Sequence, residues 1–204
     1  MSIIDDIRNF FTANKKEKRG LSLSTLFPNA NPYNADKALT LTAVWCAIRL
    51  LAESVSSLPC SVYSKQANGD KVESTNNKIY NLIKYKPNKY QNKITFFEYI
   101  MMCICTNGNS YVQIIRDGSG MPIELIPLNP EAVSVVINEG ELFYQIEEGG
   151  VLDSYDILHF KTITEDGLVG LSPIDQCKNA LNWGLNVEEF GNTFFKMEQS
   201  RVQY

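Results

Sequence analysis

The stretch from Ile157 to Asp175 constrains what this 204-residue chain can fold into more than any other part of it. It opens with an apolar, β-prone run, continues as a loop with Gly167 and Gly170, and ends on Ser172-Pro173-Ile174-Asp175. A serine at the N-cap, a proline at the first helical position and an acid at the third each suit the unpaired N–H groups of a helix start. The stretch therefore predicts a strand, a glycine loop and a capped helix in succession.

Apolar periodicity predicts the helices. Three- and four-residue steps between apolar side chains are typical of a helix with one buried face, and proline or glycine marks where such a helix ends. Thr95 and Glu98 form a capping-box pattern, and Asn107-Gly108 is a plausible stop. Helices are expected at residues 41–57, 77–85, 96–105 and 173–197.

Period-two alternation between turn signals predicts short strands. Asn68-Gly69 is a hairpin-type turn, and the later turns are too short for parallel crossovers. The fold class is therefore α+β, with N-terminal helices, a mostly antiparallel sheet and a C-terminal helix. Strands are expected at 60–65, 110–116, 123–127, 132–137, 141–146 and 157–161, with a short return strand after Asn68-Gly69. The expected core comprises Trp45, Ile48, Leu51, Phe96, Ile100, Tyr111, Leu125, Phe160 and Ile174.

Composition excludes several classes of protein. With 44% apolar and 21% charged residues, the chain is ordinary for a folded protein of one domain, or of one domain with arms. Its longest unbroken apolar run, Tyr99–Cys105, is far shorter than the ~20 residues of a membrane span. Five cysteines lie at no metal-ligand spacing, and the N-terminus lacks a signal-peptide pattern, which indicates a reducing cytoplasm. We expect no metal and no cofactor.

Charge is distributed unevenly along the chain. Residues 65–93 carry seven lysines against two acids, whereas residues 139–175 carry nine acids against Lys161 alone. The simpler interpretation is that both stretches are solvated surface, where the acidic side chains also prevent unwanted strand pairing. The functional hypothesis is that the two stretches meet across a head-to-tail subunit contact, with Lys84, Lys86 and Lys89 as candidate contact residues. Tyrosines interleaved with the lysines leave a single-stranded nucleic-acid platform as a weaker alternative.

Residues that could do chemistry do not form a recognisable catalytic pattern. His159 is the sole histidine and lies in an apolar strand, where a packed, hydrogen-bonded role is the usual one. Glu165 and Asp166 are adjacent in a loop, so they point apart and are expected to be solvated. No nucleophile elbow, phosphate-binding glycine loop or dinucleotide fingerprint is present. We expect a protein without catalytic residues, and a hydrolase using His159 is a distant alternative.

Several strings, in order, give the chain a family resemblance. Residues 157–174 resemble the "His-hydrophobic … Asp-Gly … Gly-x-Ser-Pro-Ile" segment of long-tailed bacteriophage portal proteins, with Asp166, Gly167, Gly170, Ser172 and Pro173 at the motif positions. Five further strings resemble other segments of that family: 44–59 (VWCAIRLLAESVSSLP), 82–88 (LIKYKPN), 108–111 (GNSY), 125–130 (LIPLNP) and 188–196 (EEFGNTFFK).

The resemblance implies a fold and a role. It implies a wing-like α+β domain at 39–172 and a helix at 173–204 that leads toward the stem. The residues before the domain, 1–38, are expected from their composition to form a mobile N-terminal arm. The stem, clip and crown of the family would follow, and we expect this chain to be the N-terminal wing portion without them. An N-terminal amphipathic helix at 1–12 is expected to be a docking arm or a frayed end rather than a membrane anchor.

The implied function is structural: virion assembly, as a portal-type component of the DNA-packaging and head–tail connector ring. The implied partners are further copies or a full-length portal ring, and terminase, scaffold or capsid proteins, with double-stranded DNA only inside a complete ring and no membrane. The implied location is the host cytoplasm during assembly, and the portal vertex of the virion where a full-length partner is present. The alternative is a truncated homologue that binds portal, motor or scaffold and interferes with or regulates assembly.

Overall fold

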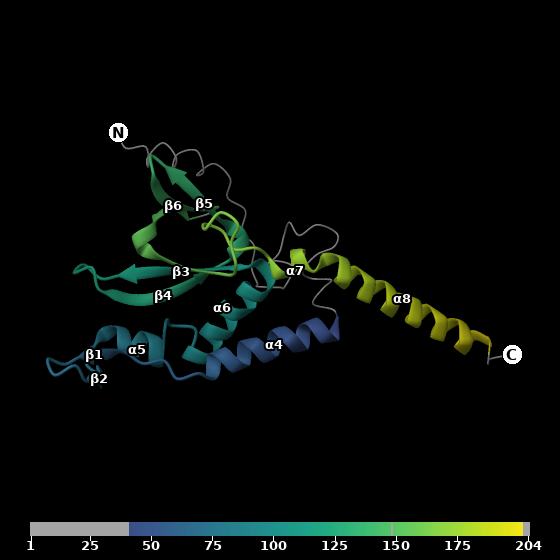
Figure 1. Cartoon of the computed structure of the whole chain (residues 1–204), viewed down its shortest axis with the longest axis horizontal. Coiled ribbons are helices and arrows are strands. Elements are labelled where there is room, and N and C mark those ends of the chain that lie inside the picture. The colour runs from purple at the N-terminus through teal and green to yellow at the C-terminus, as the bar shows by residue number, and fades with distance from the viewer. Residues whose placement is uncertain (1–40, 148, 202–204) are drawn as a thin grey trace.

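The computed structural model describes residues 41–147 and 149–201, with side chains placed up to residue 197. The predicted arm at 1–38 and its helix at 1–12 lie outside the described residues. The described part has a layered body, from which one long helix extends (Figure 1).

Helices form one side of the body. Helix α4 (Thr42–Ser57) packs lengthwise on α6 (Lys93–Asn107), which lies between α4 and the strands (Figure 1). The short α5 (Lys78–Lys84) packs against strand β4 (Pro122–Leu128). Within the described residues, none of the helices has both the length and the apolar character that crossing a membrane requires.

The strands form three antiparallel groups rather than one sheet. A hairpin of β1 (Tyr63–Lys65) and β2 (Lys71–Glu73) stands apart. The inner sheet has the order β4-β3-β8, and the outer sheet has the order β5-β6-β7. These strands are β3 (Asn109–Arg116), β4 (Pro122–Leu128), β5 (Val133–Asn138), β6 (Glu141–Ile146), β7 (Gly150–Asp153) and β8 (Ile157–Lys161).

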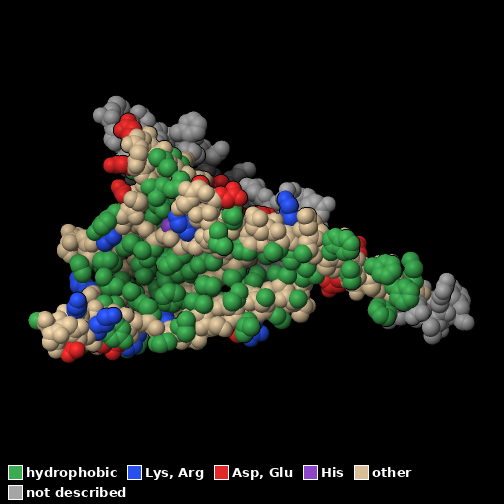
Figure 2. All heavy atoms as spheres, in the orientation of Figure 1, with side chains coloured by type: hydrophobic (Ala, Val, Ile, Leu, Met, Phe, Trp, Pro, Cys, Tyr) green, Lys and Arg blue, Asp and Glu red, His purple; other side chains and the backbone are tan. Residues whose placement is uncertain are grey.

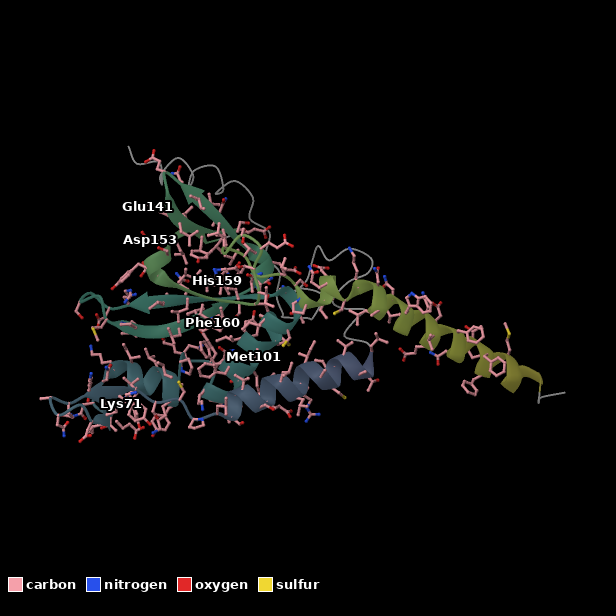
Figure 3. The ribbon with its side chains drawn as sticks, in the orientation of Figure 1. Lys71, Met101, Glu141, Asp153, His159 and Phe160 are labelled. Carbon is pink, nitrogen blue, oxygen red and sulfur yellow. The ribbon has the colours of Figure 1, made fainter. Side chains whose placement is uncertain are left out.

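Strand β3 has a buried side chain on each face. Val112 is fully buried in a cluster with α6, whose members include Phe96 and Ile100. Its neighbour Tyr111 is buried in a second cluster, where it meets Tyr144 of the outer sheet. Successive side chains of a strand point to opposite faces, so β3 joins the helical layer to the outer sheet. The same alternation places the labelled side chains of His159 and Phe160 on opposite sides of the inner sheet (Figure 3).

The core prediction is wrong at two positions. Trp45 is 43% exposed and Leu51 is 50% exposed. Helix α4 packs against α6 along one narrow line, which buries Ile48 and Ala52, so side chains at the edges of the apolar stripe remain outside. The structure confirms burial of Ile48, Phe96, Ile100, Tyr111, Leu125 and Ile174, and Phe160 packs, partly buried, on the first cluster.

Element boundaries differ from the prediction in several places, and β1, for example, starts at Tyr63 rather than at residue 60. Helix α6 begins earlier than the Thr95 capping box suggested, because the Asn92 side chain is its N-cap. Strand β7 was not predicted, since it has four residues and starts on a glycine. The C-terminal helix is divided into α7 (Pro173–Gln176) and α8 (Lys178–Arg201), with Cys177 between them.

The N-cap of α6 provides a test of this boundary. The Asn92 side chain accepts a hydrogen bond from the Thr95 backbone N–H at 3.0 Å. We expect Asn92→Ala to lower the free energy of unfolding by about 1 kcal/mol, the usual cost of losing an N-cap. Thr95→Ala, the matched control, should cost less, because it leaves that hydrogen bond intact. Urea denaturation of both variants checks the order, and a larger loss in Thr95→Ala would contradict the assignment.

Candidate functional site

Asn109 is the centre of a buried polar junction. It follows Gly108, which ends α6 in the left-handed conformation (φ +76°), and it is 7% exposed. Its Oδ1 accepts hydrogen bonds from the Gly170 N–H at 2.7 Å and from His159 Nε2 at 3.0 Å. Its Nδ2 donates to the carbonyl oxygens of Gly170 at 2.8 Å and Asn107 at 3.1 Å. A fully satisfied amide thus joins two segments that are 61 residues apart.

Two glycines let the backbones cross at this junction. A Cβ on Gly108 would lie 2.2 Å from the Leu171 carbonyl oxygen, and a Cβ on Gly170 would lie 2.2 Å from the Gly108 carbonyl oxygen. Side chains do not fit at these distances from backbone atoms. The φ of Gly170 is outside the positive region, unlike that of Gly167 (φ +78°). Close approach is therefore the reason for glycine at position 170.

The C-terminal carbonyl groups of α6 find their partners in the same place. A helix end leaves its last carbonyl groups without intrahelical partners, and burying them unpaired is costly. The Ser172 hydroxyl donates to the Thr106 carbonyl oxygen at 2.7 Å, and the Thr162 N–H donates to the Gly108 carbonyl oxygen at 2.9 Å. Ser172 Oγ also accepts from the Asp175 N–H at 3.2 Å, which confirms the predicted N-cap. One serine hydroxyl thus connects the end of α6 to the start of α7, where Pro173 occupies the first turn.

The loop between β8 and α7 is organised by its own side chains. Asp166 Oδ1 accepts hydrogen bonds from the N–H groups of Leu168 and Val169, at 2.8 Å and 3.0 Å. These two backbone donors lower the pKa of the Asp166 carboxyl group. Lys161 Nζ donates to the Gly167 carbonyl oxygen at 2.5 Å. Asp166 and Gly167 therefore shape the exposed loop, while Gly170 and Ser172 join the buried junction.

His159 extends the junction to the outer sheet. Its Nδ1 lies 3.3 Å from the Tyr144 hydroxyl, and its ring lies 4.3 Å from that of Tyr111, between centroids. Burial lowers the pKa of His159 to about 4, and the nearby Lys161 charge acts in the same direction. The imidazole is therefore neutral at pH 7 and hydrogen-bonded on both nitrogens, as expected of a structural histidine. In the described part of the chain, no three His, Cys, Asp or Glu side chains gather where they could hold a metal ion.

Two of the three candidate contact lysines, Lys84 and Lys89, already have partners within the chain. Lys84 Nζ is 2.7 Å from Glu73 Oε1, and this hydrogen bond raises the pKa of Lys84. Lys89 pairs with Glu124 at 3.1 Å. Lys86 is exposed. Figure 2 shows lysine and arginine side chains around the end of the body where β1 and β2 lie in Figure 1.

The acidic stretch does not form one surface. Glu139 and Glu141 are exposed at the β5–β6 turn, where Figure 2 shows acidic side chains at one tip of the molecule. Asp156 instead pairs with Arg116 at 2.9 Å, and this guanidinium also stacks 4.0 Å above the Tyr155 ring. Because some of these charges pair within the chain, the basic and acidic surfaces are smaller than the numbers of lysines in 65–93 and of acids in 139–175 suggest.

Sequence reasoning missed the role of Asn109. The string at 108–111 was part of the family resemblance, and so was the string at 157–174, but nothing in the sequence links one to the other. The structure brings them together through Asn109, Gly170 and Ser172. The residues of strings 108–111 and 157–174 that contact one another are those that pair with the last carbonyl groups of α6.

Comparison with known proteins shows which family this chain resembles. The model of the family described as "Phage portal protein" matches residues 42–200. The portal protein of Enterobacteria phage HK97 is 29% identical over 152 residues, which are 72% of this chain and 36% of that protein. Protein BeeE of Escherichia coli (strain K12) is 36% identical over 115 residues, which are 56% of this chain and 70% of that protein.

Solved structures agree on the fold. An HK97 family phage portal protein from Corynebacterium diphtheriae has a TM-score of 0.56 at 17% identity, over 78% of this chain and 49% of that one. A chain from the neck of a native gene transfer agent particle, computed with C12 symmetry, has a TM-score of 0.62 at 21% identity, over 78% of this chain and 43% of that one.

The chain belongs to the phage portal protein family. It spans about a third of the HK97 portal protein. The residues of the polar junction fall within the range 42–200 that the family model matches.

The glycine crossing yields a prediction. We expect Gly170→Ala to lower the free energy of unfolding by roughly 3 kcal/mol or more, because the new Cβ meets backbone atoms that cannot yield without breaking the Asn109 hydrogen bonds. Gly167→Ala is the matched control: its Cβ enters open space, so only the positive φ opposes it, at a cost of about 1 kcal/mol. Thermal and urea unfolding of both variants measure the difference. Equal losses would show that the crossing does not constrain position 170.

Proposed function

We propose that the chain is a structural virion-assembly protein, a portal-type component of the head–tail connector and DNA-packaging ring, and that it works without catalysis. Membership of the portal family, over residues 42–200, is the observation that carries this proposal. The relatives named as portal proteins support it, as do the particle-neck chains with the same fold. Residues 39–172 would form the wing-like domain, and 173–204 the helix that leads toward the stem.

The surface of α8 supports a role in assembly. The helix extends from the body (Figure 1), and its residues Trp183, Val187, Phe190 and Phe194 are 76%, 67%, 73% and 52% exposed. Their four- and three-residue spacing puts them on one stripe. Large exposed apolar patches mark surfaces that other proteins cover. The polar junction holds the start of this helix, because Ser172 caps α7 immediately before it.

The charged ends of the body are proposed to meet between neighbouring copies. Lys86 and Lys89 would approach the acidic β5–β6 turn of the next copy, which carries Glu139 and Glu141. Lys84 contributes less to such a contact, because its side chain is 31% exposed and pairs with Glu73 of its own chain, whereas the side chain of Lys89 is 76% exposed although it pairs with Glu124. A head-to-tail contact of this kind generates a ring when its rotation closes.

Charge reversal tests this contact. We expect Lys86→Glu combined with Lys89→Glu to weaken self-association about tenfold in low salt, because two exposed attractions become repulsions. Lys178→Glu, an exposed lysine at the start of α8, is the matched control. Light scattering across a concentration series measures the mass in solution. Identical association of the double variant and the control would exclude the charged contact while leaving the family role intact.

An alternative role is interference with, or regulation of, phage assembly. In this role the chain would bind full-length portal, motor or scaffold protein. The match to BeeE supports this alternative, because BeeE is a short relative. The 115 residues aligned with BeeE are 70% of that protein, whereas the 152 residues aligned with the HK97 portal protein are only 36% of it. The proposed partners in either role are portal subunits and terminase, scaffold or capsid proteins, with DNA passing only through a complete ring. The proposed locations are the host cytoplasm and the portal vertex.

Co-expression with a full-length portal protein separates the two roles. If the chain is an assembly component, we expect mixed rings, detected by native mass spectrometry, that still package DNA. If it interferes, the same mixed rings should form but packaging should fall in proportion to its content. A variant with Phe190→Ser and Phe194→Ser, which removes much of the exposed stripe, serves as the control for incorporation. Complete absence of mixed rings would contradict both roles. Enzymatic turnover that His159→Ala abolishes would instead support the alternative that the chain is a hydrolase.

A further inference from the structure

The apolar stripe of α8 has no partner within the described part of the chain. Its four members, Trp183, Val187, Phe190 and Phe194, are all exposed. At 3.6 residues per turn they fall within about 60° of one another around the helix. The rings of Phe190 and Phe194 stack with their centroids 6.5 Å apart. Figure 1 shows α8 extending away from the body, and Figure 2 shows hydrophobic side chains gathered along it.

The stripe carries no charge between its first and last residues. The acids in this part of α8 are Glu188 and Glu189, and each lies about 130° around the helix from the centre of the stripe. A row of apolar side chains at four- and three-residue steps fits the apolar face of a second helix, which has the same spacing. The surface therefore suits an uncharged helix face rather than a charged ligand.

The chain enters the described fold beside this stripe. Leu41 immediately precedes α4, and a Cβ on Gly184 of α8 would lie 3.3 Å from Leu41 Cδ1. Gly191 lies two turns further along the same side of α8, and a Cβ there would meet nothing of the described chain within 4 Å. The residues before Leu41 thus start next to Trp183, and the side of α8 beyond it is open.

A segment of matching character precedes Leu41 in the sequence. Drawn as a helix, residues 3–11 place five apolar side chains within about 120° of arc, and their polar side chains on the remaining arc. The apolar ones are Ile3, Ile4, Ile7, Phe10 and Phe11, and the polar ones are Asp5, Asp6, Arg8 and Asn9. These residues lie outside the described part of the chain.

The connection between this segment and Leu41 is long enough for docking. Residues 12–40 can span on the order of 90 Å when extended. The stripe covers only about 16 Å of α8 from Trp183 to Phe194. A tethered segment has an effective concentration of up to roughly millimolar, far above that of a second copy in dilute solution. The segment of the same chain is therefore favoured over one from a neighbour.

We propose that residues 3–11 form an amphipathic helix that docks on the apolar stripe of α8 in the same chain. Its apolar face covers Trp183, Val187, Phe190 and Phe194, and its polar face remains in solvent. A neighbouring copy that binds through the stripe must then displace the segment. The proposal concerns a single free chain and does not depend on the function proposed above.

Fluorescence of Trp183 tests the docking in the full chain. The chain has two tryptophans, so Trp45→Phe leaves Trp183 as the only indole. In this background we expect Phe10→Asp to raise the acrylamide quenching constant about twofold, because a carboxylate on the apolar face opposes docking. Asn9→Asp is the matched control: it adds the same charge on the polar face and should leave the quenching unchanged.

Hydrogen–deuterium exchange tests the same contact from the other side. Backbone amides of residues 3–11 should be protected about tenfold in the full chain, and Phe190→Ser combined with Phe194→Ser should remove this protection. Leu50→Ser combined with Leu51→Ser is the matched control, since these apolar side chains of α4 are 66% and 50% exposed and lie outside the stripe.

Three results would overturn the proposal. The first is equal quenching in Phe10→Asp and Asn9→Asp. The second is an absence of protection in residues 3–11 of the unsubstituted chain. The third is shielding of Trp183 that appears only as the protein concentration rises, because that behaviour assigns the stripe to a second copy.

Discussion

The buried end of α6 is the constraint on which the rest of the described fold depends. Its last carbonyl groups are surrounded by protein, and a carbonyl that loses water without gaining a donor costs free energy. The Asn109 side chain at the start of β3 supplies one of those donors, and the Thr162 N–H and the Ser172 hydroxyl, at the two ends of the loop between β8 and α7, supply the others. The loop after β8 must therefore pass within van der Waals contact of Gly108. That approach positions the start of α7, and α8 follows from it.

Strand β3 depends on the same constraint. It begins immediately after Gly108, so the direction in which α6 ends also sets the register of the inner sheet, in which Asn109 faces Lys161. Burial of Val112 on one face and Tyr111 on the other then places the helices and the outer sheet on opposite sides. The outer sheet is held against the inner one by the apolar cluster of Tyr111, Val133, Tyr144 and Ile157, and the Tyr144–His159 contact lies beside that cluster.

The exposed surface is consistent with a protein that works in an assembly. Trp45 and Leu51 on α4, and Trp183 and Phe190 on α8, are apolar side chains that the described chain leaves in solvent. An isolated globular protein gains nothing from such exposure, whereas a subunit buries these groups against its neighbours. Family membership and this surface both support the proposed role in an assembly.

The sequence by itself determined the local elements: the Ser172 N-cap, the Gly108 stop, the hairpin turn and the α+β class all follow from short-range rules of backbone geometry and capping. Its family resemblance marked the two strings that form the junction. Only the tertiary structure decided that Asn109 and Gly170 meet, that Gly170 is needed for close approach rather than for its φ, and that Trp45 lies outside the core. Those outcomes depend on contacts between residues far apart in the chain, which periodicity and local propensity do not encode. Burial and hydrogen-bond satisfaction are properties of the packed whole, and they settle these positions only once every neighbour is in place.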